Sequence, residues 1–217
     1  MPPEKVPYAR AARIHLAKRD PVMARIIAEI GPLGIVPRRE RFPALVRAII
    51  FQQLAGAAAR AIYNRFAALH PGADFPTPEQ VIATPDAKLR RAGLSPQKLV
   101  YIKDLAVHVR DGRLSFHRFP RMTDDEIVAD LTRVKGIGRW TAEMFLIFTL
   151  GRPDVFPVDD FGIQKAVKIA YRMRKWPKKK RMIEIGERWR PYRSAATWYL
   201  WRSLDIVLPE APPVKRR

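Results

Sequence analysis

The sequence predicts an all-α protein, and three observations support this fold class. Apolar residues recur at intervals of three and four positions, the helical period, as in the group Leu45, Val46, Ile49 and Ile50. Helix-start signals recur along the chain, and no segment alternates polar and apolar residues as a half-exposed strand would. At 217 residues the chain suits one domain, which we expect to consist of two helical lobes with a central cleft.

The expected helices each have a start or stop signal. Thr77-Pro78-Glu79-Gln80 is a capping box with proline at the first helical position, and Thr123 to Glu126 repeats the capping pattern. Residues 1–20 are basic and poorly periodic, 175–181 form a basic loop, and 206–217 form a basic tail. We expect helices over 21–30, 43–53, 57–69, 140–150, 161–171 and 193–203, and others beginning after Thr77, Ser95 and Thr123.

Composition limits the possible functions. The chain has 41 Lys and Arg against 21 Asp and Glu, a net charge of +20, which indicates a polyanionic partner and most simply nucleic acid. An anionic membrane surface is the alternative. We see no apolar run of membrane-spanning length, signal sequence or lipidation motif, which favours a cytoplasmic protein, nucleoid-associated if bacterial. The absence of cysteine excludes disulfides, thiolate catalysis and Cys-ligated metal clusters.

The segment 131–167 combines several features of a binding site. One helix ends at Val134, the turn Lys135-Gly136-Ile137-Gly138 follows, and a second helix begins near Arg139. Glycines allow a tight turn, and backbone amides at a helix N-terminus bind phosphate oxygens. The second helix carries only Glu143 as a charge, so we expect it to be buried. A proline-containing loop then places Asp159 and Asp160 at the start of another helix.

This segment resembles the helix-hairpin-helix and Gly-Pro-Asp signature of the base-excision DNA glycosylases, and is most similar to their 3-methyladenine DNA glycosylase II (AlkA-like) branch. Three further segments carry the likeness in the right order: 46–54 with its Gln-Gln-Leu end, 92–102 with Gly-Leu-Ser, and 188–201 with Arg-Trp-Arg-Pro-Tyr-Arg-Ser. The likeness covers 20–205 in a compact form without the N-terminal β domain of larger relatives. It implies the DNA-glycosylase fold, with a hairpin lobe over 43–150 and a second lobe made of the N-terminal helix and 151–205.

The resemblance implies that Asp160 is the catalytic residue, because it precedes Phe161-Gly162-Ile163 as the family's aspartate does. A carboxylate beside C1′ stabilises the oxocarbenium-like sugar formed when an N-glycosidic bond breaks, and can orient or deprotonate the attacking water. The alternative is that Asp159 or Asp160 is only an N-cap, which the residues alone favour. Both roles are compatible, with Asp159 as the cap and Asp160 as the reacting group.

The residue at position 140 bears on the type of reaction. Bifunctional members of the superfamily have a lysine there that forms a Schiff base; Trp140 cannot, so we expect a monofunctional enzyme without lyase activity. The resemblance also implies a base pocket with an aromatic wall, since π faces suit a cationic alkylated base. The alternative for these aromatic residues is a place in the core. The expected pocket residues are Trp140, Trp201, Met144 (where some relatives have tyrosine) and Tyr192.

Two groups of residues are expected to contact DNA. Gln53 and Leu54 stand where the family inserts a wedge into the minor groove, with Gln53 as the best candidate; ordinary solvated helix-end residues are the alternative. The hairpin group should bind a backbone phosphate and consists of Lys135, Gly136, Ile137, Gly138 and Arg139. The resemblance also implies a possible monovalent cation at the hairpin carbonyls. We predict no other cofactor and no metal, because the four histidines have no ligand spacing.

Together these features predict a monofunctional glycosylase of base excision repair that flips and excises alkylated purines such as 3-methyladenine and 7-methylguanine. The expected partner is damaged duplex DNA, with no membrane or obligate protein partner and a monomer as the default. One alternative is a glycosylase for other damaged bases on the same scaffold. The other is a non-catalytic DNA-binding protein that uses only the hairpin, which would have no need of Asp160.

Overall fold

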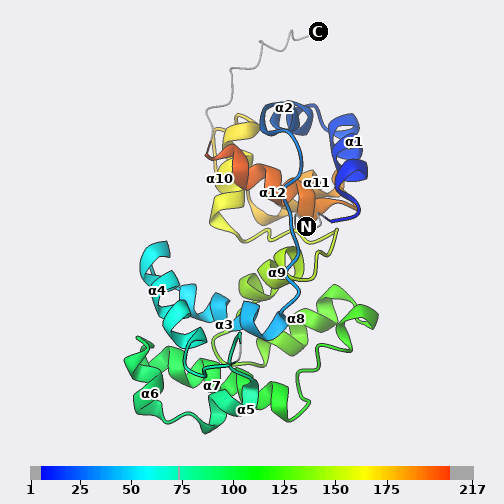
Figure 1. Ribbon diagram of the computed structural model, residues 1–217. Coiled ribbons are helices and arrows are strands. Elements are labelled where there is room, and N and C mark those ends of the chain that lie inside the picture. Colours follow the sequence, from blue (N-terminus) through cyan, green and yellow to red (C-terminus); the bar gives the residue numbers. More distant parts are fainter. Residues whose placement is uncertain (1–5, 73, 206–217) are drawn as a thin grey trace, which may run out of the picture. The chain divides into compact units, whose positions relative to one another are not determined.

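The computed structural model describes residues 6–72 and 74–205, and within these residues every regular element is helical (Figure 1). The predicted all-α class is therefore confirmed. The predicted tail at 206–217 lies outside the described residues. The helices are α1 (Ala9–Arg19), α2 (Pro21–Ile30), α3 (Arg41–Phe51), α4 (Gly56–Ala67), α5 (Pro78–Ala83), α6 (Asp86–Arg91), α7 (Pro96–Arg110), α8 (Asp124–Thr132), α9 (Arg139–Phe148), α10 (Phe161–Ala170), α11 (Lys179–Glu187) and α12 (Arg193–Ser203), with a short 3₁₀ turn at Phe119–Arg121.

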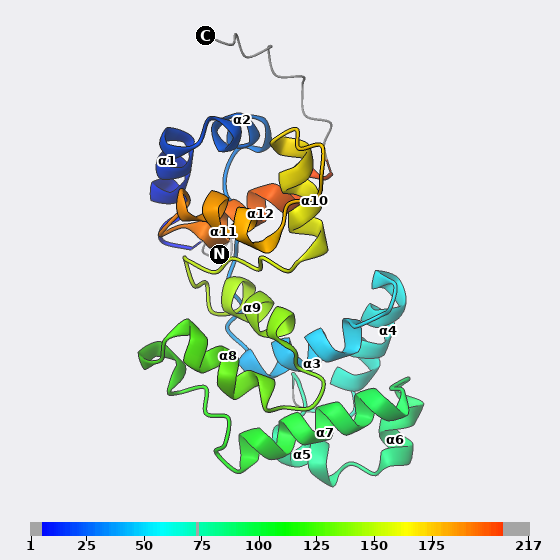
Figure 2. The same ribbon diagram turned by 180° about the vertical axis from the view of Figure 1, so that it is seen from behind.

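The chain divides into two compact units. The terminal unit consists of Met1–Pro37 and Gly151–Arg217, and the central unit consists of Arg38–Leu150. Helices from both ends of the chain thus share one unit: Figures 1 and 2 show α1 and α2 beside α10, α11 and α12. The part of the chain between them, α3 to α9, forms the other unit by itself.

Helix α12 is the core of the terminal unit and packs against α1, α2 and α10 (Figure 2). Small residues on α12 let these helices approach closely, and even its polar side chains Ser194 and Thr197 are fully buried. Both are satisfied by the loop that precedes α10: Ser194 Oγ accepts the Val155 amide at 3.0 Å, and Thr197 Oγ1 donates to Val155 O at 3.5 Å. The loop leading to α10 is therefore anchored on α12.

A buried carboxylate joins three segments of the terminal unit. Asp20 is 1 % exposed and caps α2, accepting the amide hydrogens of Val22 at 2.9 Å and Met23 at 3.5 Å. Its second oxygen accepts from the Trp189 indole at 3.1 Å and from the Tyr171 hydroxyl at the end of α10. The N-terminal helices are thereby tied to α10 and to the segment before α12.

Burial of tyrosines predicts a loss of stability at high pH. Tyr199 is fully buried, donates to Gly31 O at 2.9 Å, and has a pKa raised by burial to about 12. A phenol in the unfolded chain ionises near pH 10, so below this pH both states keep the proton and the stability is fully present. Between pH 10 and about 12 the unfolded state alone loses the proton, and stability should fall as pH rises.

This expectation is measured by urea unfolding of the wild type and of Tyr199→Phe across pH 9 to 12. The variant should lose stability less steeply, since lysines and the other tyrosines titrate equally in both proteins. Burial also raises the pKa values of Tyr8 and Tyr171, so some alkaline sensitivity remains in the variant. Identical slopes for the two proteins would contradict the role assigned to Tyr199.

In the central unit, α9 is buried on most sides, as its composition predicted. Its one acidic residue, Glu143, is 9 % exposed and accepts from Arg139 Nε at 3.0 Å, one helical turn away. The capping boxes predicted at Thr77 and Thr123 are both present, at the starts of α5 and α8. The helices predicted over 21–30 and 193–203 have those bounds in the structure, and the ends of the other helices with predicted bounds differ by at most two residues.

Three helices, α1, α6 and α11, were not predicted, and the reasons are physical. Helix α6 has only six residues, of which Leu89 alone is buried, so it carries no helical period. Helix α1 lies in the segment interpreted as poorly periodic, because only Ala12 and Leu16 of its residues are buried. Helix α11 begins inside the segment interpreted as a basic loop; its first turn is Lys179, Lys180 and Arg181, and its apolar anchors Met182 and Ile185 follow. Packing of a few apolar side chains stabilises these helices despite their charged sequences.

Among the helices that the structure describes, none combines the length and apolar character needed to cross a membrane.

Candidate functional site

The predicted helix-hairpin-helix is present in the central unit and consists of α8, the turn at Lys135 to Gly138, and α9. The turn is anchored by Val134 and Ile137, which are 1 % and 3 % exposed. Gly136 has φ +80°, and a Cβ there would lie 2.1 Å from Tyr101 Cδ2 on α7. Only glycine fits this position, since both the backbone conformation and the aromatic ring exclude a side chain.

The hairpin exposes the groups that a phosphate would meet. Gly138 is the N-cap of α9, and no side chain caps this helix. Lys135 and Arg139 flank the turn with side chains that are 66 % and 63 % exposed. Uncapped amides at a helix N-terminus between two exposed cations form an arrangement suited to an anion. The predicted monovalent cation remains a prediction; the Gly136 carbonyl already accepts the Gln52 side chain at 2.8 Å.

The predicted wedge residues follow the end of α3. Gln53 and Leu54 are both exposed, Leu54 by 39 % of its surface. Gln53 has φ +56°, a left-handed conformation that non-glycine residues adopt at a cost of about 1–3 kcal/mol. The chain therefore turns sharply at Gln53 and presents it to solvent.

In the terminal unit, Asp160 is fixed at the N-terminus of α10. Its Oδ1 accepts the Ile163 amide at 2.7 Å and the Trp201 indole N–H at 3.1 Å. A Cβ at Gly162 would lie 3.1 Å from both Asp160 Oδ1 and Trp201 Nε1, so the glycine leaves room for this contact. The structure thus brings together two predicted site residues that are 41 positions apart.

The expectation that Asp159 caps this helix is wrong. Asp160 itself is the N-cap, and the exposed side chain of Asp159 pairs with Lys179 Nζ at 2.7 Å. Ile163 is the third residue of α10, and an N-cap side chain reaches the amide at that position. Capping and a chemical role for Asp160 are compatible, because the cap holds the carboxylate in one orientation.

Tyr192 lies among aromatic residues of the terminal unit. Its ring stacks on Tyr8, with centroids 5.9 Å apart, and meets the His15 ring edge-on at 5.4 Å. These contacts give no direct support for a place in the base pocket, which stays a prediction for Tyr192.

Trp140 and Met144 lie one turn apart on α9, and the Trp140 side chain is 51 % exposed. Met144 lines a cavity of about 290 Å³ in the central unit. The other lining residues are four aromatic or small apolar residues of α3 and α9, two threonines and two arginines, namely Ala44, Ala48, Phe145, Phe148, Thr141, Thr149, Arg38 and Arg47.

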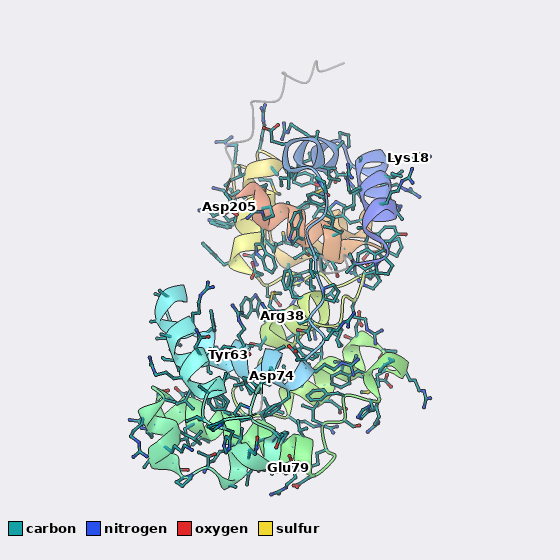
Figure 3. The ribbon with its side chains drawn as sticks, viewed as in Figure 1. Lys18, Arg38, Tyr63, Asp74, Glu79 and Asp205 are labelled. Atoms are coloured by element: carbon teal, nitrogen blue, oxygen red, sulfur yellow. The ribbon has the colours of Figure 1, made fainter. Side chains whose placement is uncertain are left out.

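The two arginines of this cavity were not identified from the sequence. The Arg47 guanidinium lies over the Phe51 ring, 3.9 Å from its centroid, and burial together with the charge of Arg38 lowers its pKa. Arg38 and the neighbouring Tyr63 are labelled in Figure 3. The sequence feature that could have identified Arg47 is its place within the apolar stripe of the predicted 43–53 helix. Among residues 6–72 and 74–205, no group of His, Asp or Glu is arranged to hold a metal ion.

The helix-hairpin-helix and the aspartate that caps α10 define a class of DNA-repair protein. Residues 46–191 match the family described as HhH-GPD superfamily base excision DNA repair protein, and the chain belongs to this superfamily.

Within the superfamily the chain is similar to enzymes for alkylated DNA. It is 36% identical over 200 residues to DNA-3-methyladenine glycosylase 1 of Schizosaccharomyces pombe, covering 90% of this chain and 88% of that protein. A solved structure of a 3-methyladenine DNA glycosylase from that yeast, in complex with abasic DNA, superimposes with a TM-score of 0.81 at 34% identity and covers 93% of this chain and 100% of the other. The DNA-3-methyladenine glycosidase of Bacillus halodurans superimposes equally well, with a TM-score of 0.81, 37% identity and 88% of each chain covered.

Proposed function

We propose that this protein is a monofunctional DNA glycosylase that excises alkylated purines, of the 3-methyladenine and 7-methylguanine type, from duplex DNA. The observation that carries the proposal is the Asp160 carboxylate, held at the start of α10 by the Ile163 amide and the Trp201 indole. The similar proteins are DNA-3-methyladenine glycosylases of yeast and bacteria, which supports the same substrate class.

The reaction needs an anion beside the sugar rather than a strong acid. An alkylated purine carries positive charge and leaves readily, so the barrier lies in the positive charge that develops on the sugar. A carboxylate in a fixed orientation stabilises that charge without reorganisation, and it orients the water that attacks C1′. Asp160 Oδ1 accepts hydrogen bonds from two neutral donors, which hold the carboxylate in one orientation.

The remaining predicted residues have separate tasks. The amides of the hairpin turn bind a backbone phosphate and hold the DNA in register. Trp140, with half of its surface exposed, offers a π face to the extruded base, and the absence of an amine at this position excludes a Schiff base. The product is therefore an abasic site in an intact strand.

The test is single-turnover release of base from methylated duplex DNA by the wild-type protein. We expect release of methylpurines, with strand breaks that appear only after alkali is added. Breaks before alkali treatment would contradict the monofunctional mechanism. A folded protein that binds DNA and releases no methylpurine would contradict the proposed substrate class and favour the non-catalytic alternative.

A further inference from the structure

We propose that Lys98 is a positioning residue that, through Gln52, couples the hairpin turn (residues 135–138) to the wedge loop (residues 52–55), so that phosphate binding at the turn sets the wedge for base extrusion. This inference rests on the proposed function, because it assigns a role in the flipping step. It concerns only the central unit, in which every contact that carries it is made.

The first contact fixes the end of α3. The last carbonyls of a helix have no partner within the helix and need donors from elsewhere. Lys98 Nζ supplies them, donating to Ile50 O at 2.7 Å and to Gln52 O at 2.8 Å. The ammonium is thus shared between the final turn of α3 and the first residue of the wedge loop.

The second contact joins the wedge loop to the hairpin turn. The Gln52 side chain donates from Nε2 to Gly136 O at 2.8 Å. Gln52 is therefore hydrogen-bonded to Lys98 through its main-chain carbonyl and to the hairpin turn through its side-chain amide. The next residue is Gln53, the predicted wedge, whose left-handed backbone is held in place by this doubly bonded neighbour.

One helix supports both structures. On α7, Lys98 contacts the wedge loop, Tyr101 lies against Gly136, and Asp104 Oδ2 accepts the Lys135 amide at 2.9 Å. These three residues are spaced by three positions and so lie along one side of α7. Lys98 is itself at the start of this helix, where its amide donates to the Ser95 cap at 3.2 Å. The turn and the loop consequently share a single rigid platform.

Lys98 is partly buried, and this burial lowers the pKa of its ammonium group. A lysine that served only to attract DNA would not need hydrogen bonds to two main-chain carbonyls. Because Lys98 Nζ donates to two main-chain carbonyls of the protein, we expect its effect on DNA to act through the wedge loop and not through a phosphate.

The experiment compares Lys98→Met and Gln52→Leu with the wild type on two substrates. One carries 7-methylguanine paired with cytosine, and the other carries it opposite an abasic site, where no base pair has to be broken. On the paired lesion we expect each variant to excise about tenfold or more slowly, the loss associated with a charged or buried hydrogen bond. On the unpaired lesion the rates should stay within about threefold of the wild type, because the chemical step is intact.

Three further measurements sharpen the test. The double variant should be no slower than either single variant, because both changes break the same connection. Lys103→Met is the matched control: this lysine is on the same helix and pairs with Asp86, so its loss should leave both rates unchanged. Fluorescence of 2-aminopurine in the duplex measures extrusion without base release, and the rise produced by wild-type protein should be lost in Lys98→Met.

Equal loss on the paired and unpaired substrates, or additive effects in the double variant, would overturn the proposal and leave Lys98 a purely structural residue. Wild-type rates for Lys98→Met on the paired lesion would overturn it as well. If the wild type released no base from any substrate, the proposed function would fail, whereas the fluorescence measurement would still test the coupling by itself.

Discussion

The variant Asp160→Asn is expected to bind DNA as the wild type does and to release methylpurines about 100- to 1,000-fold more slowly. Asparagine keeps the Oδ1 acceptor for Ile163 and Trp201 and is as good an N-cap as aspartate, so α10 should remain folded. It removes only the negative charge, which in the proposed mechanism stabilises the developing oxocarbenium ion. The measurement is single-turnover release of base, with a parallel titration of DNA binding.

The matched control for this variant is Asp159→Asn. The change has the same chemistry one residue earlier, at an exposed carboxylate that pairs with Lys179 and makes no cap. Its rate should stay close to that of the wild type. If both variants lost activity equally, a general loss of negative charge at this loop would be the cause. If Asp160→Asn retained full activity, Asp160 would be only a cap.

The largest expected effect on stability is that of Asp20→Ala, with a loss of about 3–7 kcal/mol in the free energy of unfolding. The change removes the cap of α2 and leaves the Trp189 indole and the Tyr171 hydroxyl without their acceptor in a buried site. A lost cap costs about 1 kcal/mol, and each buried donor left unsatisfied costs about 1–3 kcal/mol. Urea unfolding monitored by tryptophan fluorescence measures the loss, since Trp189 is one of the partners.

Thr123→Ala provides the comparison. Thr123 also caps a helix, α8, and accepts the Glu126 amide at 3.3 Å, but its hydrogen bonds are exposed to solvent. Its loss should cost about 1 kcal/mol, the ordinary value for a cap. An Asp20→Ala protein no less stable than Thr123→Ala would show that the contacts of Asp20 with Trp189 and Tyr171 contribute little.

Sequence reasoning succeeded where the signal is local. The helix predicted over 193–203 has those bounds in the structure, and the capping boxes at Thr77 and Thr123 are formed, because an N-cap and its partner are only three residues apart. It failed for α1, α6 and α11, because these helices depend on packing of a few apolar residues within charged sequences. It also assigned the cap of α10 to Asp159, since two adjacent aspartates look alike without the backbone geometry.

By itself, the sequence determined the class of chemistry. A glycine pair between two helices, an aspartate at a helix start and a tryptophan where a lysine would form a Schiff base are matters of residue type and short spacing. Only the tertiary structure decided how these groups are held. The Trp201 bond to Asp160, the Asp20 cluster and the path from Lys98 through Gln52 to Gly136 join residues far apart in the chain. No local pattern encodes such contacts, because they exist only after the helices have packed and brought a buried donor to an acceptor.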